Sequence, residues 1–166
     1  MMANSRSGTA SAAAAKTTAT LPSRHCTQCT KAACCNEYHV YVIELHDDAR
    51  LSSAMKGQNL EHEGERGVLY VGMTGHRPEC RFEQHRTYAK KAKSFMCDCF
   101  GLEEERPFRG HGGRTKGSKV AGKHARYLRP KLFRKYNPIP TSDEAKAKEA
   151  ELAEALRAKG YWVYQK

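Results

Sequence analysis

Two short apolar runs constrain the fold of this chain more than any other feature. HVYVIEL occupies residues 39–45 and GVLYVGM occupies residues 67–73, and both are rich in β-branched and aromatic residues. Runs of this length and composition indicate strands. The polar stretch 46–66 between them predicts a long loop. We therefore expect these two runs to form a pair of partner strands.

The residues after the second run predict a helix. Pro78 suits the first turn of a helix, and Glu79 is favourable near its positive end. We expect this helix to continue to about Ser94. Arg81 and His85 are four residues apart and should therefore lie on the same helix face.

The clearest helix signal lies near the end of the chain. Thr141 with Glu144 three residues later forms a capping-box pattern, and Gly160 follows as a stop signal. YWVYQ at 161–165 then predicts a short final strand. The basic segment 127–136 before this helix predicts a short helix or turn.

One carboxylate lies on the apolar face of that last helix. Ala145, Leu152 and Leu156 share a face, and Glu149 falls between them, whereas Glu151 and Glu154 should point into solvent. An unpaired carboxylate within an apolar stripe is costly. Glu149 should therefore meet a cation, a hydrogen-bond network or a metal, unless it lies at a hydrated edge of the stripe.

The charge distribution favours a polyanionic partner. The chain carries a formal charge of +11, and residues 89–135 hold fourteen cations against four acids. Nucleic acid is the first expectation and an acidic membrane surface the rival, although no apolar run approaches the roughly 18 residues of a membrane span. The glycine-rich stretch 96–123 predicts an inserted basic loop of low order. Its expected backbone contacts are Arg109, Arg114, Lys116, Lys119 and Lys123.

The N-terminal region predicts two further segments. Residues 1–24, rich in Ala, Ser and Thr, should be a disordered tail. Residues 25–36 are Cys-rich and predict either a zinc knuckle or free reduced thiols. The zinc ligands would come from Cys26, Cys29, Cys34 and Cys35, with His25, Cys97 and Cys99 as further candidates.

The seven cysteines are an odd number, and no secretory signal is visible. A disulfide framework is therefore disfavoured, and a reducing compartment is expected. We expect a cytoplasmic location, or an organellar matrix if the acid-free tail is a transit peptide.

The order of the strand tyrosines, a glycine and a helical arginine resembles the GIY-YIG nuclease family. The resemblance rests on HVYVIEL, on GVLYVGMTGHRPECRFEQH at 67–85 and on EAKAKEAELAEAL at 144–156, and covers roughly residues 38–90 and 124–164. It implies a mixed α and β domain over residues 37–166, with a small antiparallel three-stranded sheet flanked by helices and interrupted by the basic insertion.

The resemblance also implies a site for phosphodiester hydrolysis. Tyr41 would position or deprotonate the attacking water, and Tyr70 would join the same hydrogen-bond network. Arg81 would hold a phosphate oxygen, for which its planar fork is well suited. Glu149 would bind one Mg²⁺ or Mn²⁺ ion, since these hard ions prefer oxygen.

Two further residues receive roles from the resemblance. His85 would contact phosphate or order a water. Gly72 would let the substrate backbone approach, because it has no side chain.

The expected function is a metal-dependent endonuclease, with DNA favoured over RNA as the partner. The chain has His39 where the family name begins with glycine, and its nearest late amide is Gln165, where many members carry an asparagine. These departures leave open a degenerate domain that binds nucleic acid without cutting it, as in a ribonucleoprotein. A soluble basic adaptor without a nucleic-acid role is the third alternative.

Overall fold

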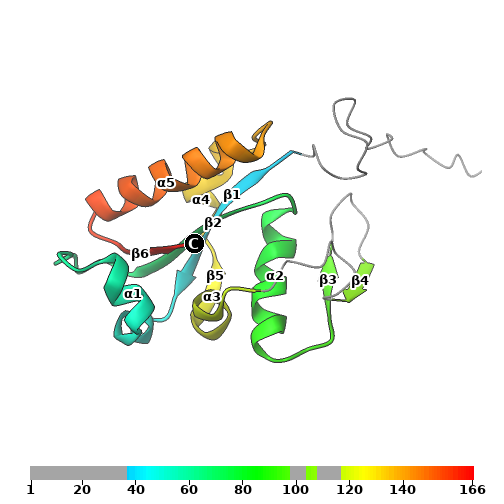
Figure 1. Ribbon diagram of the computed structural model, residues 1–166, viewed down its shortest axis with the longest axis horizontal. Helices are drawn as coiled ribbons and strands as arrows, with labels where there is room; N and C mark the ends of the chain where they lie inside the picture. The colour runs from blue at the N-terminus through cyan, green and yellow to red at the C-terminus, as the bar shows by residue number, and fades with distance from the viewer. Residues whose placement is uncertain (1–36, 98–103, 108–116) are drawn as a thin grey trace, which may run out of the picture.

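A four-stranded sheet with helices on both faces forms the centre of the molecule (Figure 1). The computed structural model describes residues 37–97, 104–107 and 117–166. The sheet order is β5 (Ala125–Leu128), β1 (His39–Leu45), β2 (Val68–Thr74) and β6 (Trp162–Gln165). β1 runs antiparallel to both β2 and β5, whereas β2 and β6 are parallel.

The predicted strand pair is confirmed, and it lies at the centre of the sheet. β1 and β2 coincide closely with the two apolar runs, and Tyr41 lies directly opposite Gly72. Both strands are buried along almost their whole length. Strands covered by helices on both faces require apolar residues at successive positions, which explains why these runs do not alternate cleanly.

The predicted three-stranded antiparallel sheet is wrong in two respects. β5 adds a fourth strand, formed partly by residues for which we predicted a helix or turn. β6 runs parallel to β2, so the sheet is mixed. A four-residue strand has too few positions for a visible alternation, and the direction of β6 depends on how the preceding helix returns the chain to the sheet.

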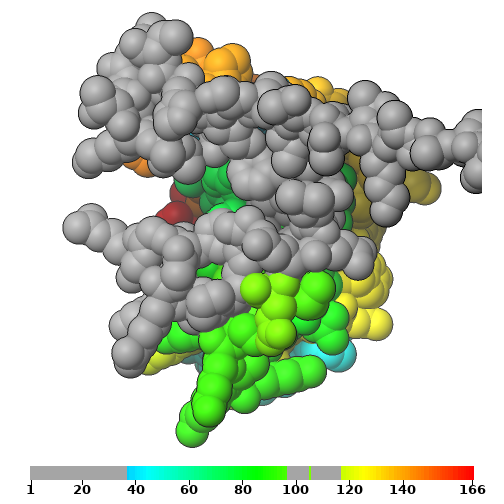
Figure 2. Space-filling model, turned by 90° about the vertical axis from the view of Figure 1, so that its right-hand side faces the viewer, coloured from blue at the N-terminus to red at the C-terminus, as the bar shows by residue number. Residues whose placement is uncertain are grey.

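Helices pack on both faces of the sheet (Figure 1). α2 (Pro78–Ala89) and α3 (Lys119–His124) lie on the face that carries Tyr41 and Tyr70, and α5 (Ser142–Ala158) covers the other. α2 ends before the predicted Ser94, because Lys91 has a left-handed φ of 58° that no helix tolerates. β3 (Ser94–Cys97) then pairs with β4 (Glu104–Pro107) in a separate two-stranded sheet, on the side of the molecule seen in Figure 2.

The last helix begins and ends as predicted. The Thr141 hydroxyl accepts a hydrogen bond from the backbone N–H of Glu144, and Gly160 adopts a φ of 87° just after the helix. The predicted apolar face is buried, whereas Glu151 and Glu154 are exposed. The buried residues of α5 are Ala145, Glu149, Leu152, Ala153 and Leu156.

Two predicted loops contain regular structure, and the short helix or turn predicted for residues 127–136 is confirmed over residues 130–136. The stretch 46–66 holds a 3₁₀ helix, η1 (Asp47–Leu51), and α1 (Ser53–Gln58), which is capped by Ser52. The stretch 96–123 includes β4 and most of α3, so the prediction of an insertion without order is wrong for those residues. The segment 127–136 contains α4 (Pro130–Phe133) and η3 (Arg134–Tyr136).

Several predictions fall outside the described residues. These are the tail 1–24, the Cys-rich segment 25–36, Cys99, Arg109, Arg114 and Lys116. Among the helices in the described ranges, none combines the length and the apolar character that a membrane span requires.

Candidate active site

Five of the predicted site residues come together from four elements of the fold. Tyr41 lies on β1, Tyr70 on β2, Arg81 and His85 on α2, and Glu149 on α5. The ring centroids of Tyr41 and Tyr70 are 5.9 Å apart, and those of Tyr70 and His85 are 5.3 Å apart. The charges of Arg81 and Glu149 both act on the pKa of each tyrosine. The fold therefore brings Arg81 and His85 to the two tyrosines, and it places Glu149 near enough for its charge to affect both phenols.

Gly72 makes room for the ring of Tyr41. A Cβ atom at position 72 would lie 2.6 Å from the Tyr41 hydroxyl oxygen and 2.9 Å from the ring of Tyr70. Tyr41 faces Gly72 across the β1–β2 ladder, so the phenol ring folds over the space that any side chain would fill. We expected this space to admit the substrate backbone, but the tyrosines occupy it.

His85 is held by hydrogen bonds at both ring nitrogens. The backbone N–H of Ser118 donates to Nδ1 at 2.8 Å, so Nδ1 carries no proton. In a neutral imidazole the proton then resides on Nε2. Nε2 lies 2.8 Å from the Tyr41 hydroxyl oxygen and therefore donates to it. The hydroxyl proton of Tyr41 remains free to be donated to another group.

The surroundings of His85 keep it neutral. Burial, and then the positive charges of Arg81 and Lys166, lower the pKa of His85 to about 2. The ring is 0% exposed. A phosphate contact or a water-ordering role does not fit this geometry, because the ring is inaccessible and both nitrogens are engaged.

The two tyrosines are more buried than a site open to substrate would suggest. Tyr41 is 1% and Tyr70 3% exposed, so neither hydroxyl opens onto the surface where a substrate would approach. Burial raises the pKa of both phenols, and the negative charge of Glu149 raises both pKa values further. The Arg81 guanidinium opposes this at Tyr41 through its charge and a hydrogen bond, so Arg81 stabilises the phenolate form.

Gln84 helps to orient Arg81. The Arg81 guanidinium donates from Nη1 to the side-chain oxygen of Gln84, one helical turn further along α2. Gln84 is 0% exposed, although an uncharged amide is normally a surface residue. This hydrogen bond to a buried acceptor restricts the Arg81 side chain to few rotamers and directs the guanidinium toward Tyr41.

Glu149 is a buried carboxylate. Its side chain is 6% exposed, and no Lys or Arg within the described ranges forms an ion pair with it. Hydrogen bonds from the backbone of Lys166 and Met73 lower its pKa, but burial outweighs them and raises the pKa to about 7. The predicted alternatives of a Lys or Arg partner or a hydrated stripe edge therefore do not describe Glu149 in this part of the chain.

The environment of Glu149 fits a hard divalent cation. A carboxylate has about four lone-pair positions, and the two backbone groups leave some of them available. A cation would also offset the burial penalty that raises the pKa. Among the described residues no three His, Cys, Asp or Glu side chains cluster into a metal site, so an ion at Glu149 would depend largely on water and substrate oxygens. Mg²⁺ is commonly held by one or two carboxylates, waters and substrate phosphates.

α3 is docked against α2 beside the site. A Cβ at Gly122 would lie 2.6 Å from Cβ of Ala89, and one at Gly117 would lie 3.1 Å from Cα of His85. These close approaches bring the backbone of Ser118 to His85. Of the predicted nucleic-acid contacts, Lys119 and Lys123 are exposed on α3.

Three residues near the site were not found from the sequence. Gln84 follows Arg81 by three positions and could have been recognised on the predicted helix. Tyr164 lies in the predicted final strand, but the face of the sheet on which its side chain lies could be predicted only by knowing which strand it pairs with. The contribution of Ser118 comes from its backbone, so no side-chain pattern marks it.

Comparisons with known proteins add no family assignment. No protein-family model, no curated protein and no solved structure matches this chain.

Proposed function

We propose that this chain is a divalent-metal-dependent endonuclease that hydrolyses phosphodiester bonds in nucleic acid. The single observation that carries the proposal is the convergence of Tyr41, Tyr70, Arg81, His85 and Glu149 from β1, β2, α2 and α5. Ordinary core packing does not require a buried neutral histidine, an arginine and an unpaired carboxylate around two phenols. Hydrolysis requires such groups, because negative charge develops at the phosphate and at the leaving oxygen.

His85 and Tyr41 would act together on the attacking water. His85 donates from Nε2 to the Tyr41 oxygen, which fixes the phenol and leaves its own proton free to orient a neighbouring oxygen. If Tyr41 releases that proton to solvent water before substrate binds, the same donor and the Arg81 charge stabilise the phenolate, which would then accept a proton from the attacking water. Tyr70 lies beside Tyr41 and lowers its pKa through a hydrogen bond.

Arg81 and an ion bound by Glu149 would neutralise negative charge on the phosphate. Arg81, oriented by Gln84, would hold a non-bridging oxygen with its planar fork. Glu149 would hold one Mg²⁺ or Mn²⁺ ion, which when bound neutralises charge on the phosphate and assists the leaving oxygen. Met73 and Lys166 keep the Glu149 carboxylate in place through backbone hydrogen bonds.

A second candidate function is favoured by the burial of the two tyrosines. With Tyr41 and Tyr70 at 1% and 3% exposure, a substrate phosphate reaches their hydroxyls only if neighbouring groups move. A domain of this kind could bind nucleic acid through its basic surface without cutting it. The presence of His39 in place of the first family glycine supports the same alternative.

A nicking assay on supercoiled plasmid tests the proposed activity. The wild-type protein should convert plasmid to the open circular form with Mg²⁺ or Mn²⁺ and not with EDTA. Glu149→Gln should reduce the rate at least about a hundredfold, since metal assistance amounts to several kcal/mol of the barrier. Glu151→Gln is the matched control, because Glu151 lies exposed on the same helix and pairs with Lys148.

The fold of the Glu149→Gln variant must be checked by thermal unfolding. The new amide would place an N–H₂ group near one of the backbone groups of Met73 and Lys166 that now bond the carboxylate. A folded Glu149→Gln protein that cuts at the wild-type rate would refute the assignment. A wild-type protein that binds plasmid but never cuts it would establish the non-catalytic alternative.

A further inference from the structure

A third tyrosine continues the row formed by Tyr41 and Tyr70. Tyr164 on β6 lies opposite Tyr70 in the parallel β2–β6 ladder. Their ring centroids are 6.0 Å apart with an interplanar angle of 35°. The three phenols therefore stand side by side on β1, β2 and β6, on the same face of the sheet.

Tyr164 differs from its two neighbours in its accessibility. Tyr41 and Tyr70 are buried, whereas Tyr164 is only partly buried. The Tyr41 hydroxyl is engaged by His85. The Tyr164 hydroxyl forms no hydrogen bond with any other residue in the described ranges. Within the described residues, Tyr164 is thus the member of the row whose hydroxyl a ligand can reach without displacing a hydrogen-bond partner.

Tyr164 is close in the chain to a residue that contacts Glu149. Two residues further along the chain, the backbone of Lys166 forms a hydrogen bond with Glu149. Lys166 follows the end of β6 and is exposed, and its charge reaches His85, which packs edge-on against Tyr70, the neighbour of Tyr164. A phenolic donor beside a cation suits an anionic oxygen.

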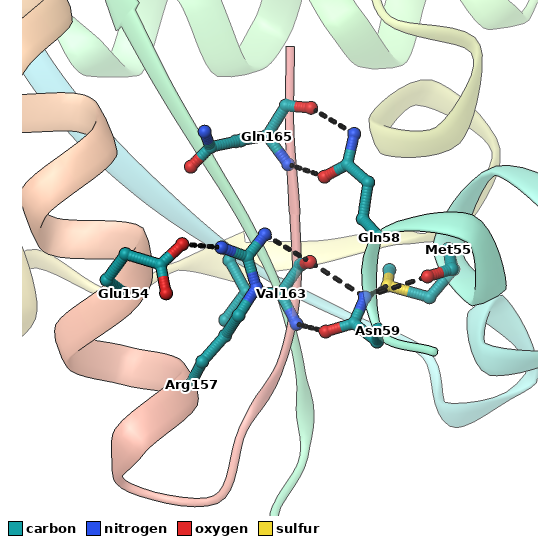
Figure 3. Close-up of polar contacts among 7 residues, drawn as sticks. All are labelled: Met55, Gln58, Asn59, Glu154, Arg157, Val163 and Gln165. Carbon is teal, nitrogen blue, oxygen red and sulfur yellow. Dashed lines mark hydrogen bonds and ion pairs between the residues drawn. The ribbon is translucent and has the colours of Figure 1, made fainter. Parts of the chain in front are cut away.

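The backbone on both sides of Tyr164 is held by two side-chain amides (Figure 3). Asn59 accepts from the N–H of Val163 at 3.1 Å and donates to its carbonyl at 2.9 Å. Gln58 does the same for Gln165, at 2.9 and 2.7 Å. These amides replace a missing neighbouring strand along the outer edge of β6. They shield the edge from association and also fix the strand that presents Tyr164.

We propose that Tyr164 is a substrate-binding residue whose hydroxyl donates a hydrogen bond to a backbone phosphate of the nucleic acid, next to the phosphate that is cleaved. The proposal rests on the proposed function for the identity of the substrate. Contacts of this kind fix the register of the nucleic acid and carry no sequence information. The role of Tyr164 would be to place the scissile phosphate against Arg81 and Glu149, not to take part in the chemical step.

The Tyr164→Phe variant tests this proposal by removing only the hydroxyl. Binding is measured by fluorescence anisotropy with a fluorescein-labelled DNA duplex and with its single strand, in EDTA so that no cleavage occurs. We expect Kd to rise about tenfold, the effect of losing a hydrogen bond to a charged group. Tm should be unchanged, because no hydrogen bond to a described residue is lost.

Tyr127→Phe is the matched control. Tyr127 is 45% exposed on β5, at the opposite edge of the sheet, where its hydroxyl donates to Glu44. Wild-type Kd values for Tyr164→Phe with both probes would overturn the proposal, as would an equal loss of binding in Tyr127→Phe. A loss of kcat without a change in Kd would also overturn it.

The same measurement separates this proposal from the nuclease assignment. Binding is measured without metal. The Kd values of the wild type and of Tyr164→Phe can therefore be compared even if the wild-type protein binds nucleic acid without cutting it. A tenfold loss in Tyr164→Phe in that case would support the phosphate contact while the proposed catalysis fails.

Discussion

At the scale of single residues, His85 illustrates how a backbone contact can decide the chemistry of a side chain. The N–H of Ser118 assigns the proton of the imidazole to Nε2, and Nε2 donates it to Tyr41. With a pKa lowered to about 2, His85 stays neutral throughout the usual working range. In the proposed mechanism His85 is therefore a positioning residue for Tyr41 and not a general acid or base.

Substitution of His85 should lower kcat with little change in KM. His85→Ala removes the donor to Tyr41, and we expect a loss of about tenfold to a hundredfold, the effect of removing a supporting hydrogen bond. His85→Gln should recover part of the rate, because its amide N–H can still donate. His46→Gln is the control, since His46 is an exposed histidine outside the site.

The pH profile supplies a second readout for the same residue. At saturating Mg²⁺, which would keep Glu149 ionised, the wild-type rate should show no step near the ordinary histidine pKa of 6.5, because His85 does not titrate there. A step near pH 6.5 that disappears in His85→Gln would contradict the neutral-donor role.

At the scale of elements, α3 is the part of the basic region whose placement is described. Its glycine at position 122 lets it pack closely on α2 and leaves Lys119 and Lys123 on the exposed side, four residues apart. Neither lysine forms an ion pair with a described residue. Two unpaired cations one helical turn apart, beside the candidate site, are suited to contacts with phosphate groups.

The Lys119→Ala/Lys123→Ala variant should bind duplex DNA more weakly and with a flatter salt dependence. Each phosphate contact that is lost should reduce the slope of log K against log salt by about 0.9. A Lys146→Ala/Lys159→Ala variant is the control, because both lysines are exposed at α5, which covers the other face of the sheet. A slope equal to that of the wild type would exclude α3 from the interface.

At the scale of the whole molecule, Glu149 couples folding to pH and, in the proposed function, to the binding of a metal ion. The folded state raises the pKa of Glu149 from its ordinary value of 4.5 to about 7. Between these values the folded state therefore holds the proton more tightly than the unfolded state. The free energy of unfolding should fall as pH rises through this window and level off above it.

The expected loss is about 2 kcal/mol for the metal-free protein, after allowance for solvent screening. Urea unfolding in EDTA at several pH values measures it, and Glu149→Gln should lack this contribution while Glu151→Gln retains it. Above pH 7, Mg²⁺ should raise the Tm of the wild type and of Glu151→Gln but not of Glu149→Gln. Equal responses to Mg²⁺ in Glu149→Gln and the wild type would exclude Glu149 as the ligand.

Local signals in the sequence determined much of this molecule. The two central strands follow from concentrated β-branched and aromatic residues, and α5 follows from the Thr141 cap, the Gly160 stop and its apolar face. The position of Glu149 on the buried face of α5 could also be predicted, because the helical repeat is visible over a few neighbouring residues. The proximity of Tyr41, Tyr70 and Arg81 was expected through the family resemblance alone.

Tertiary structure decided what no local pattern encodes. β5 and the parallel direction of β6 depend on pairing between segments far apart in the chain. The proton position on His85 depends on a backbone group 33 residues away, and the edge of β6 on amides more than 100 residues away. Backbone N–H and C=O groups are the same in almost every residue, so the sequence does not show which of them form a given hydrogen bond. Pairing between distant segments also produces no periodic pattern in the sequence. For that reason the sequence by itself determined which groups are present, and only the packed fold determined which of them touch.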